Sequence, residues 1–160
     1  MAEVTGYALS HHLSDLVGRK VEFKQATVAV ETARAVYGIY NVLPDNTPVV
    51  VKTDLALLGS FAGLLVGLPD EEVKQRLKVS PIEELLRDAM YEVLNITSTV
   101  VTTEGRAVFG RMVTDVAYVD GQAGEVLKKP GRRSYFNVSV EGYQGGRFTV
   151  LSPILAVKIA

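Results

Sequence analysis

The stretch from Leu55 to Leu68 constrains the fold of this chain more than any other part of its sequence. It is apolar almost throughout, so a helix formed there would be apolar around its whole circumference and would need cover on more than one side. A membrane crossing takes roughly 20 apolar residues, and this stretch is shorter and contains three glycines. We therefore predict a buried helix within a larger core and no association with a membrane.

Three further helices are predicted around it. An amphipathic helix fits residues 5–17, with Thr5 as its N-cap and Gly18 as its stop signal. A short helix fits residues 70–77, because the helix dipole favours the acidic residues of its first turn. The clearest signals follow Ser80: an S-x-x-E capping box formed by Ser80 and Glu83, with Pro81 at the first helical position. Apolar residues then recur at helical spacing: Ile82, Leu85, Leu86, Ala89, Met90, Val93 and Leu94.

The remaining segments have the β-branched and aromatic residues typical of strands. They cover residues 21–23, 28–30, 36–42 and 49–51 before the helices, and 107–119, 135–140, 148–151 and 155–159 after them, with 142–146 as a hairpin loop. Helices and strands are thus segregated along the chain, which favours an α+β fold in which helices pack on one face of an antiparallel sheet. No linker or repeat divides the sequence, so residues 1–160 are predicted to form a single domain.

Composition excludes several functions. Lys and Arg number 17 and Asp and Glu 18, for a formal net charge of −1, which disfavours binding to nucleic acid. Zero cysteines exclude thiolate metal sites and cysteine nucleophiles. Adjacent His11 and His12 cannot share a helix face, so we expect no metal site. The first six residues lack the pattern of a signal peptide, and we expect a cytoplasmic protein.

Polar residues gather on one side of the helix that follows Ser80. At 100° per residue, Asp88, Glu92 and Asn95 fall within about 60° of one another, opposite the apolar stripe and on the same side as Tyr91. From these residues alone, the simplest interpretation is a solvated helix face with Asn95 as a C-terminal cap.

The run Asp88-Ala89-Met90-Tyr91-Glu92-Val93-Leu94-Asn95 also resembles the D/S-x-x-x-E-x-x-N signature of the CheC, CheX and FliY family of chemotaxis phosphatases. The family is similar in placing an apolar helix and a short acidic helix before the motif helix, and paired strands after it. The resemblance implies a CheC/CheX-like α/β sandwich and hydrolysis of the aspartyl phosphate on a CheY-like response regulator.

Roles for individual residues follow from this resemblance. Glu92 would pair with the active-site lysine of the regulator, and Asn95 would orient the attacking water. An amide suits that task, because its carbonyl accepts a hydrogen bond from water while its amino group donates to a phosphoryl oxygen. Asp88 and Tyr91 would support the site or dock the partner. The chain would need no cofactor of its own, because the regulator supplies the Mg²⁺ ion and the phosphorylated carboxylate.

Two departures from the family pattern leave other functions open. CheC-type members repeat the motif on the first helix, whereas Ser10, Ser14 and Val17 occupy those positions here, so a single CheX-like site is expected. Thr99 replaces a common glycine, and the β-branched residues 99–103 lower helix propensity, so that the helix could end near Asn95. The alternative is a non-catalytic adaptor of the same fold that binds a receiver domain or a flagellar component.

A basic cluster at residues 128–133 suggests a third hypothesis, a module that binds a cyclic dinucleotide. Asn137 and Ser139 resemble part of the D/N-x-S-x-x-G motif of PilZ cyclic-dinucleotide receptors, with Arg132 and Arg133 as the arginines. In that family the arginines lie much further upstream, so a solvated loop that enters a strand is the preferred interpretation. Docking to an acidic partner surface is the alternative role for this loop. The CheX resemblance also implies a homodimer joined through sheet strands, for which residues 155–159 are a candidate edge strand.

Overall fold

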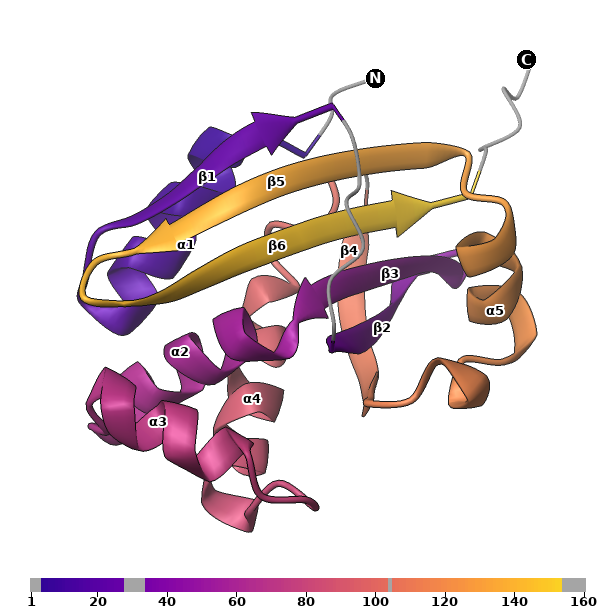
Figure 1. Cartoon of the computed structure of the whole chain (residues 1–160). Coiled ribbons are helices and arrows are strands. Elements are labelled where there is room, and N and C mark those ends of the chain that lie inside the picture. The colour runs from indigo at the N-terminus through magenta and orange to yellow at the C-terminus, as the bar shows by residue number, and fades with distance from the viewer. Residues whose placement is uncertain (1–3, 28–33, 104, 154–160) are drawn as a thin grey trace.

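A computed structural model describes residues 4–27, 34–103 and 105–153 of the chain (Figure 1). Over these residues the chain forms α1 (Gly6–Val17), β1 (Val21–Ala26), β2 (Ala35–Leu43), β3 (Thr47–Asp54), α2 (Leu55–Val66), α3 (Asp70–Leu77), α4 (Glu84–Thr97), β4 (Arg106–Val113), the 3-10 turn η1 (Val116–Tyr118), α5 (Gly121–Lys128), β5 (Arg132–Val140) and β6 (Tyr143–Ser152).

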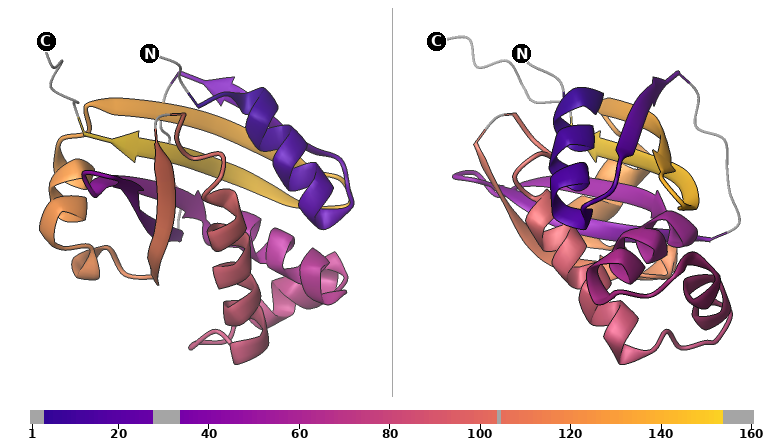
Figure 2. Two further views of the ribbon diagram at one scale, coloured as in Figure 1. Left: turned by 180° about the vertical axis from the view of Figure 1, so that it is seen from behind. Right: turned by 90° about the vertical axis from the view of Figure 1, so that its left-hand side faces the viewer.

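All six strands join one antiparallel sheet in the order β1-β5-β6-β3-β2-β4. The main core lies between one face of this sheet and the helices α1, α2 and α4, with α3 packed outside α2. Figure 2 shows α1 and α4 on the side of the sheet turned toward the viewer in its left panel. The predicted α+β fold is therefore confirmed. The smaller helix α5 adds a second core on the opposite face, against β2 and β3.

The apolar helix α2 lies at the centre of the main core, as its sequence predicts. Its first nine residues are nearly all buried, and it packs against α4, β6 and α3. Gly63 allows α3 to approach closely, because a Cβ atom added there would lie 2.2 Å from Cγ2 of Val73. Among the described residues, no helix has both the length and the apolar character that a membrane crossing requires.

The close approach of α2 and α3 predicts the effect of adding one methyl group. Gly63→Ala should lower the free energy of unfolding by about 1–2 kcal/mol, because overpacking outweighs the gain in helix propensity. Chemical denaturation of Gly63→Ala, Val73→Ala and the double variant measures it. If the clash is the cause, Val73→Ala will be less damaging in the Gly63→Ala background than alone; simply additive losses would contradict the contact.

Helix boundaries agree with the sequence at α1 and differ at α4. Thr5 caps α1 by accepting a hydrogen bond from the Ala8 N–H (3.1 Å). At α4 the predicted capping box is wrong: the helix begins at Glu84, and no side chain caps it. The Glu83 carboxylate instead binds the Arg76 guanidinium at 2.7 Å, which ties the start of α4 to α3. The helix continues beyond Asn95 to Thr97, so the β-branched residues do not end it early.

The C-terminal half differs from the prediction in three places. The strand expected over 107–119 ends at Val113, and α5 was not predicted, since two glycines in eight residues weaken its helical pattern. The β5–β6 hairpin turns at Glu141 and Gly142 (φ 77°), while the rest of the expected loop belongs to β6. The strands expected at 28–30 and 155–159 lie outside the described residues.

Candidate functional site

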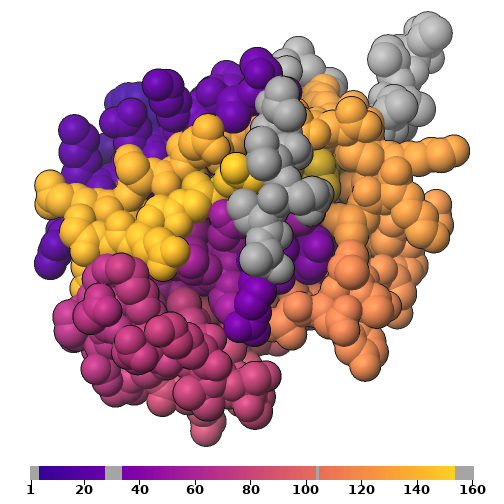
Figure 3. All heavy atoms as spheres, viewed as in Figure 1, coloured from indigo at the N-terminus to yellow at the C-terminus, as the bar shows by residue number. Residues whose placement is uncertain are grey.

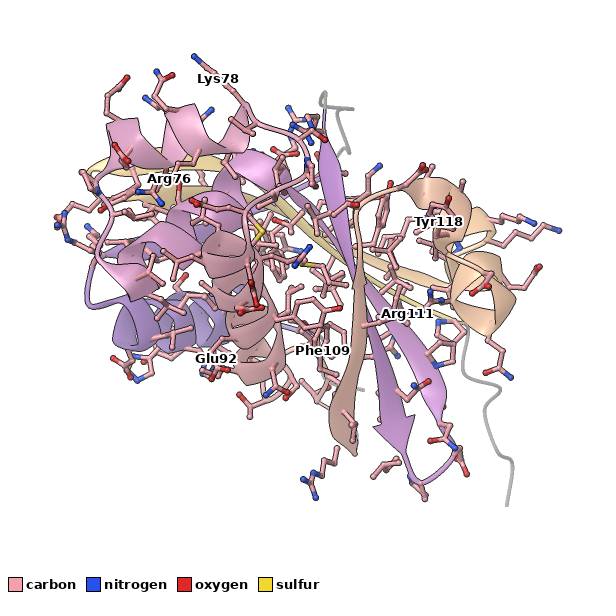
Figure 4. The ribbon with its side chains drawn as sticks, turned by 90° about the horizontal axis from the view of Figure 1, so that it is seen from below. Arg76, Lys78, Glu92, Phe109, Arg111 and Tyr118 are labelled. Carbon is pink, nitrogen blue, oxygen red and sulfur yellow. The ribbon has the colours of Figure 1, made fainter. Side chains whose placement is uncertain are left out.

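The outward face of α4 carries the four residues that the sequence analysis selected. Asp88, Tyr91, Glu92 and Asn95 are all exposed, whereas the apolar residues between them are buried in the main core. Figure 4 shows this helix beside β4, with Glu92 on α4 and Phe109 on the neighbouring strand. The helix thus presents two carboxylates and an amide to solvent on a rigid element.

Side chains from two distant elements anchor the C-terminal end of α4. The last carbonyls of a helix have no partner within the helix itself. The Tyr40 hydroxyl on β2 donates to the Leu94 carbonyl at 2.6 Å, and Nε2 of His12 on α1 lies 3.0 Å from the Ile96 carbonyl. Burial raises the pKa of the Tyr40 hydroxyl, which keeps it protonated as a donor. These two contacts flank Asn95 in the sequence and hold the turn that carries it.

An aromatic cluster joins α4 to the edge strand β4. The Phe109 ring lies 5.5 Å from the Tyr91 ring in an edge-on arrangement and 5.4 Å from the Tyr40 ring. Tyr91 is 40% exposed, so one part of its ring packs on Phe109 while the rest faces solvent. Its position therefore fixes one part of the ring by packing and leaves the rest in contact with solvent.

A hollow of about 410 Å³ opens beside Asn95, between the end of α4 and the start of β4. Asn95, Ser98, Thr99 and Thr102 line one part of it, and Arg106 contributes a cation. The hollow is therefore polar on its α4 side, whereas Ala107, Val108 and Phe109 make its β4 side apolar.

Both motif residues are available for a partner. Within the described part of the chain, the side chains of Glu92 and Asn95 make no hydrogen bond or ion pair, and the same holds for Asp88. Across these same residues, no group of three or more metal-ligating side chains is close enough to hold a metal ion.

The first helix carries no second copy of the motif, and the two serines that stand at motif positions bind β1 instead. The Ser10 hydroxyl donates to the Gly6 carbonyl at 2.6 Å and accepts from the Phe23 N–H at 2.8 Å. The Ser14 hydroxyl accepts from the Val21 N–H at 3.0 Å. Positions 10 and 14 are thus used to bind strand to helix, and α4 alone presents the complete motif.

Of the four residues of the cyclic-dinucleotide hypothesis, Arg132 lies on the opposite face of β5 from Arg133, Asn137 and Ser139. Along β5, side chains alternate between the two faces of the sheet. Arg132 lines a hollow of about 260 Å³ together with Ser134, whereas Asn137 and Ser139 line a different hollow on the outer face. Lys128 and Lys129 lie at the end of α5, which Figure 1 shows far from α4. The basic cluster is therefore not part of the α4 face.

Sequence reasoning missed Tyr40, His12 and Phe109. Tyr40 lies in the strand that the sequence predicts over residues 36–42, but the partner of its hydroxyl is a helix carbonyl more than 50 positions away. In the sequence, His12 stands out only as a possible metal ligand, whereas in the structure its ring nitrogen lies against a carbonyl at the end of α4. No local pattern identifies such long-range contacts.

Comparison with known proteins finds similarity in structure alone. No protein-family model matches the sequence, and no curated protein matches it either. The middle domain of FliM from H. pylori superposes with a TM-score of 0.63 at 14% identity, covering 96% of this chain and 87% of that one. FliM in a FliG-FliM complex from H. pylori gives 0.63 at 12% identity, covering 98% and 90%. FliY from Thermotoga maritima gives 0.58 at 15% identity, covering 91% and 82%.

The chain therefore has the fold of the CheC/CheX/FliY proteins, over almost its whole length. The motif on α4 implied this fold, and the structure confirms it.

The tyrosine anchor generates a test of how α4 is held. Tyr40→Phe should lower the free energy of unfolding by about 1–3 kcal/mol, because it leaves the buried Leu94 carbonyl without its donor. Tyr118→Phe, at a tyrosine that is 69% exposed, serves as the control and should change stability by less than about 0.5 kcal/mol. Equal losses in the two variants, measured by urea denaturation, would show that the Tyr40 hydroxyl does not anchor the helix.

Proposed function

We propose that this protein dephosphorylates the aspartyl phosphate of a CheY-like response regulator. The observation that carries the proposal is the placement of Glu92 and Asn95: both are exposed and unpaired within the described residues, on one face of a helix that continues past Asn95. The shared fold with FliY supports the same assignment.

In this proposal the chain contributes positioning, and its partner contributes the charged machinery. Glu92 forms an ion pair with the active-site lysine of the regulator, which sets the angle of approach. Asn95 then reaches the phosphoryl group, where its amide holds a water molecule in line with the bond to be broken. The regulator supplies Mg²⁺ and the phosphorylated carboxylate, so the chain needs neither a metal nor a general base of its own.

Asp88 and Tyr91 act in docking. Asp88 lies one helical turn before Glu92 and extends the negative charge of this face. Tyr91 offers an exposed aromatic edge whose ring is already fixed by Phe109, so its burial by a partner loses little conformational entropy.

Removal of the Asn95 amide gives the direct test. Asn95→Ala should lower the rate at which the protein shortens the lifetime of a phosphorylated CheY-like domain by about 100-fold or more, since a positioned hydrogen-bonding group of this kind is worth that much. Gln122→Ala, at an exposed amide on α5, is the matched control and should leave the rate unchanged. The measurement is loss of phosphate from the labelled regulator.

Glu92→Gln separates docking from chemistry. It should raise KM more than it lowers kcat, because the lost ion pair acts in binding. A phosphate lifetime that wild-type protein does not change, or an Asn95→Ala variant as active as wild type, would contradict the phosphatase proposal.

The second candidate is a non-catalytic adaptor of the same fold. It is favoured by the similarity to the FliM middle domain, a protein also solved in complex with FliG, and by Thr99 in place of the family glycine. An adaptor would bind a receiver domain or a flagellar component and leave the phosphate lifetime unchanged, so the same assay distinguishes the two functions.

The proposed assembly is a homodimer that acts in the cytoplasm, where receiver domains reside. The described sheet ends in two edge strands, β1 and β4, and an edge strand offers unpaired backbone groups to a second copy. Sedimentation at equilibrium tests it, and a monomer at all concentrations would contradict it.

A further inference from the structure

The face of the sheet opposite α1 carries a polar hollow that the α4 site does not use. It has a volume of about 480 Å³ and lies over β1, β5 and β6. Figure 3 shows this face of the molecule, where β5 and β6 reach the surface with no helix over them. Six of its lining residues have polar side chains: Glu22, Lys24, Asp54, Asn137, Ser139 and Arg147.

Strand register explains why these side chains converge. Lys24 pairs with Asn137, and Asn137 pairs with Arg147, so the three stand in one row across adjacent strands. Neighbouring strands place paired residues about 5 Å apart, so this row spans about 10 Å. Such a distance is short enough for the long Lys24 and Arg147 side chains to reach a common group above Asn137.

The next row leaves the floor of the hollow open. Glu22 pairs with Ser139, but β6 carries glycines beside them. Gly145 has no room for a side chain, because an added Cβ would lie 2.3 Å from the Val138 carbonyl oxygen. The sheet surface beside the Lys24-Asn137-Arg147 row therefore has no side chain on the β6 side of Ser139.

Arg147 supplies the observation that points to a ligand. Its Nη1 atom is buried and has no hydrogen-bond partner among the described residues. Its backbone is fixed on both sides, since the Arg147 N–H donates to Oδ2 of Asp54 at 2.8 Å and its carbonyl accepts from the Thr53 hydroxyl at 3.1 Å. A buried cationic donor without an acceptor is costly, so an acceptor from outside the chain would stabilise it.

The neighbouring groups define the chemistry of that acceptor. Lys24 also forms no ion pair within the described residues, so two cationic groups and the Asn137 amide can donate to one anion. The Asp54 carboxylate also lines the hollow, but it lies on the β3 side of Arg147, at the opposite end from Lys24. A phosphoryl group offers enough oxygens for all three, arranged tetrahedrally. Glu22 and Ser139, in the next row, can accept and exchange hydrogen bonds with hydroxyl groups.

We propose that this hollow binds a small phosphate monoester whose organic part carries hydroxyl groups. The phosphoryl group lies among Lys24, Asn137 and Arg147, and the hydroxyl groups face Glu22 and Ser139. The inference does not depend on the function of α4, because the two sites share no residue. It uses Asn137 and Ser139 without the arginines 132 and 133 of the cyclic-dinucleotide hypothesis.

Titration with glycerol 3-phosphate, followed by NMR of the backbone amides, tests the proposal. Saturable shifts are expected in β1, β5 and β6 around residues 24, 137 and 147. Arg147→Gln should weaken binding at least tenfold, whereas Arg133→Gln, an exposed arginine on β5 that does not line the hollow, should stay within twofold of wild type. Acetate and inorganic phosphate are the comparison probes.

Several outcomes would overturn the proposal. No saturable binding, or binding by Arg147→Gln as tight as wild type, removes the site. Equal weakening by Arg147→Gln and Arg133→Gln would indicate bulk charge only. Acetate binding as tightly as glycerol 3-phosphate contradicts the phosphoryl group, and inorganic phosphate doing so contradicts the roles of Glu22 and Ser139. If circular dichroism shows that Arg147→Gln is unfolded, exposed Lys24→Gln replaces it, with at least threefold weakening expected and an unchanged affinity counting against the site.

Discussion

The carbonyl groups at the end of α4 are the point on which the functional surface depends. A helix end leaves its last carbonyls without intrahelical donors, and here β2 and α1 supply them through Tyr40 and His12. Both contacts come from elements that are themselves fixed in the main core. The turn that carries Asn95 is thereby held by groups of this chain itself, as the positioning role proposed for Asn95 requires.

The contacts that Tyr40 and His12 make with α4 explain how a helix with unfavourable local propensity still extends beyond Asn95. The β-branched residues that follow predict an early end, yet tertiary contacts outweigh a propensity difference of a few tenths of a kcal/mol per residue. The Thr97 hydroxyl adds to this by donating to the Val93 carbonyl at 2.6 Å within the helix. Aromatic packing of Tyr91 on Phe109 then fixes the rotation of the helix against β4.

The sequence was sufficient for the order of elements and for the exposed face of α4, because both follow from periodicity. It was insufficient wherever a distant partner decides the outcome. The predicted Ser80 capping box is wrong, and the Glu83 carboxylate binds Arg76 on α3 instead. The turn η1 and the helix α5 follow β4, whose Arg111 (Figure 4) binds Asp120 at 2.7 Å. The outward residues of β5 could be assigned to one face, but only strand register reveals that Lys24 and Arg147 stand beside Asn137.

The serines of α1 have a consequence for stoichiometry. The hydroxyl groups of Ser10 and Ser14 accept hydrogen bonds from β1. An acidic or amide side chain at either position would disrupt these bonds between α1 and β1. The first helix is therefore bound to β1 through the positions that a second copy of the α4 motif would occupy. Under the proposed function each molecule offers a single docking position on α4, so binding capacity rises with the number of chains and not with the number of motifs per chain.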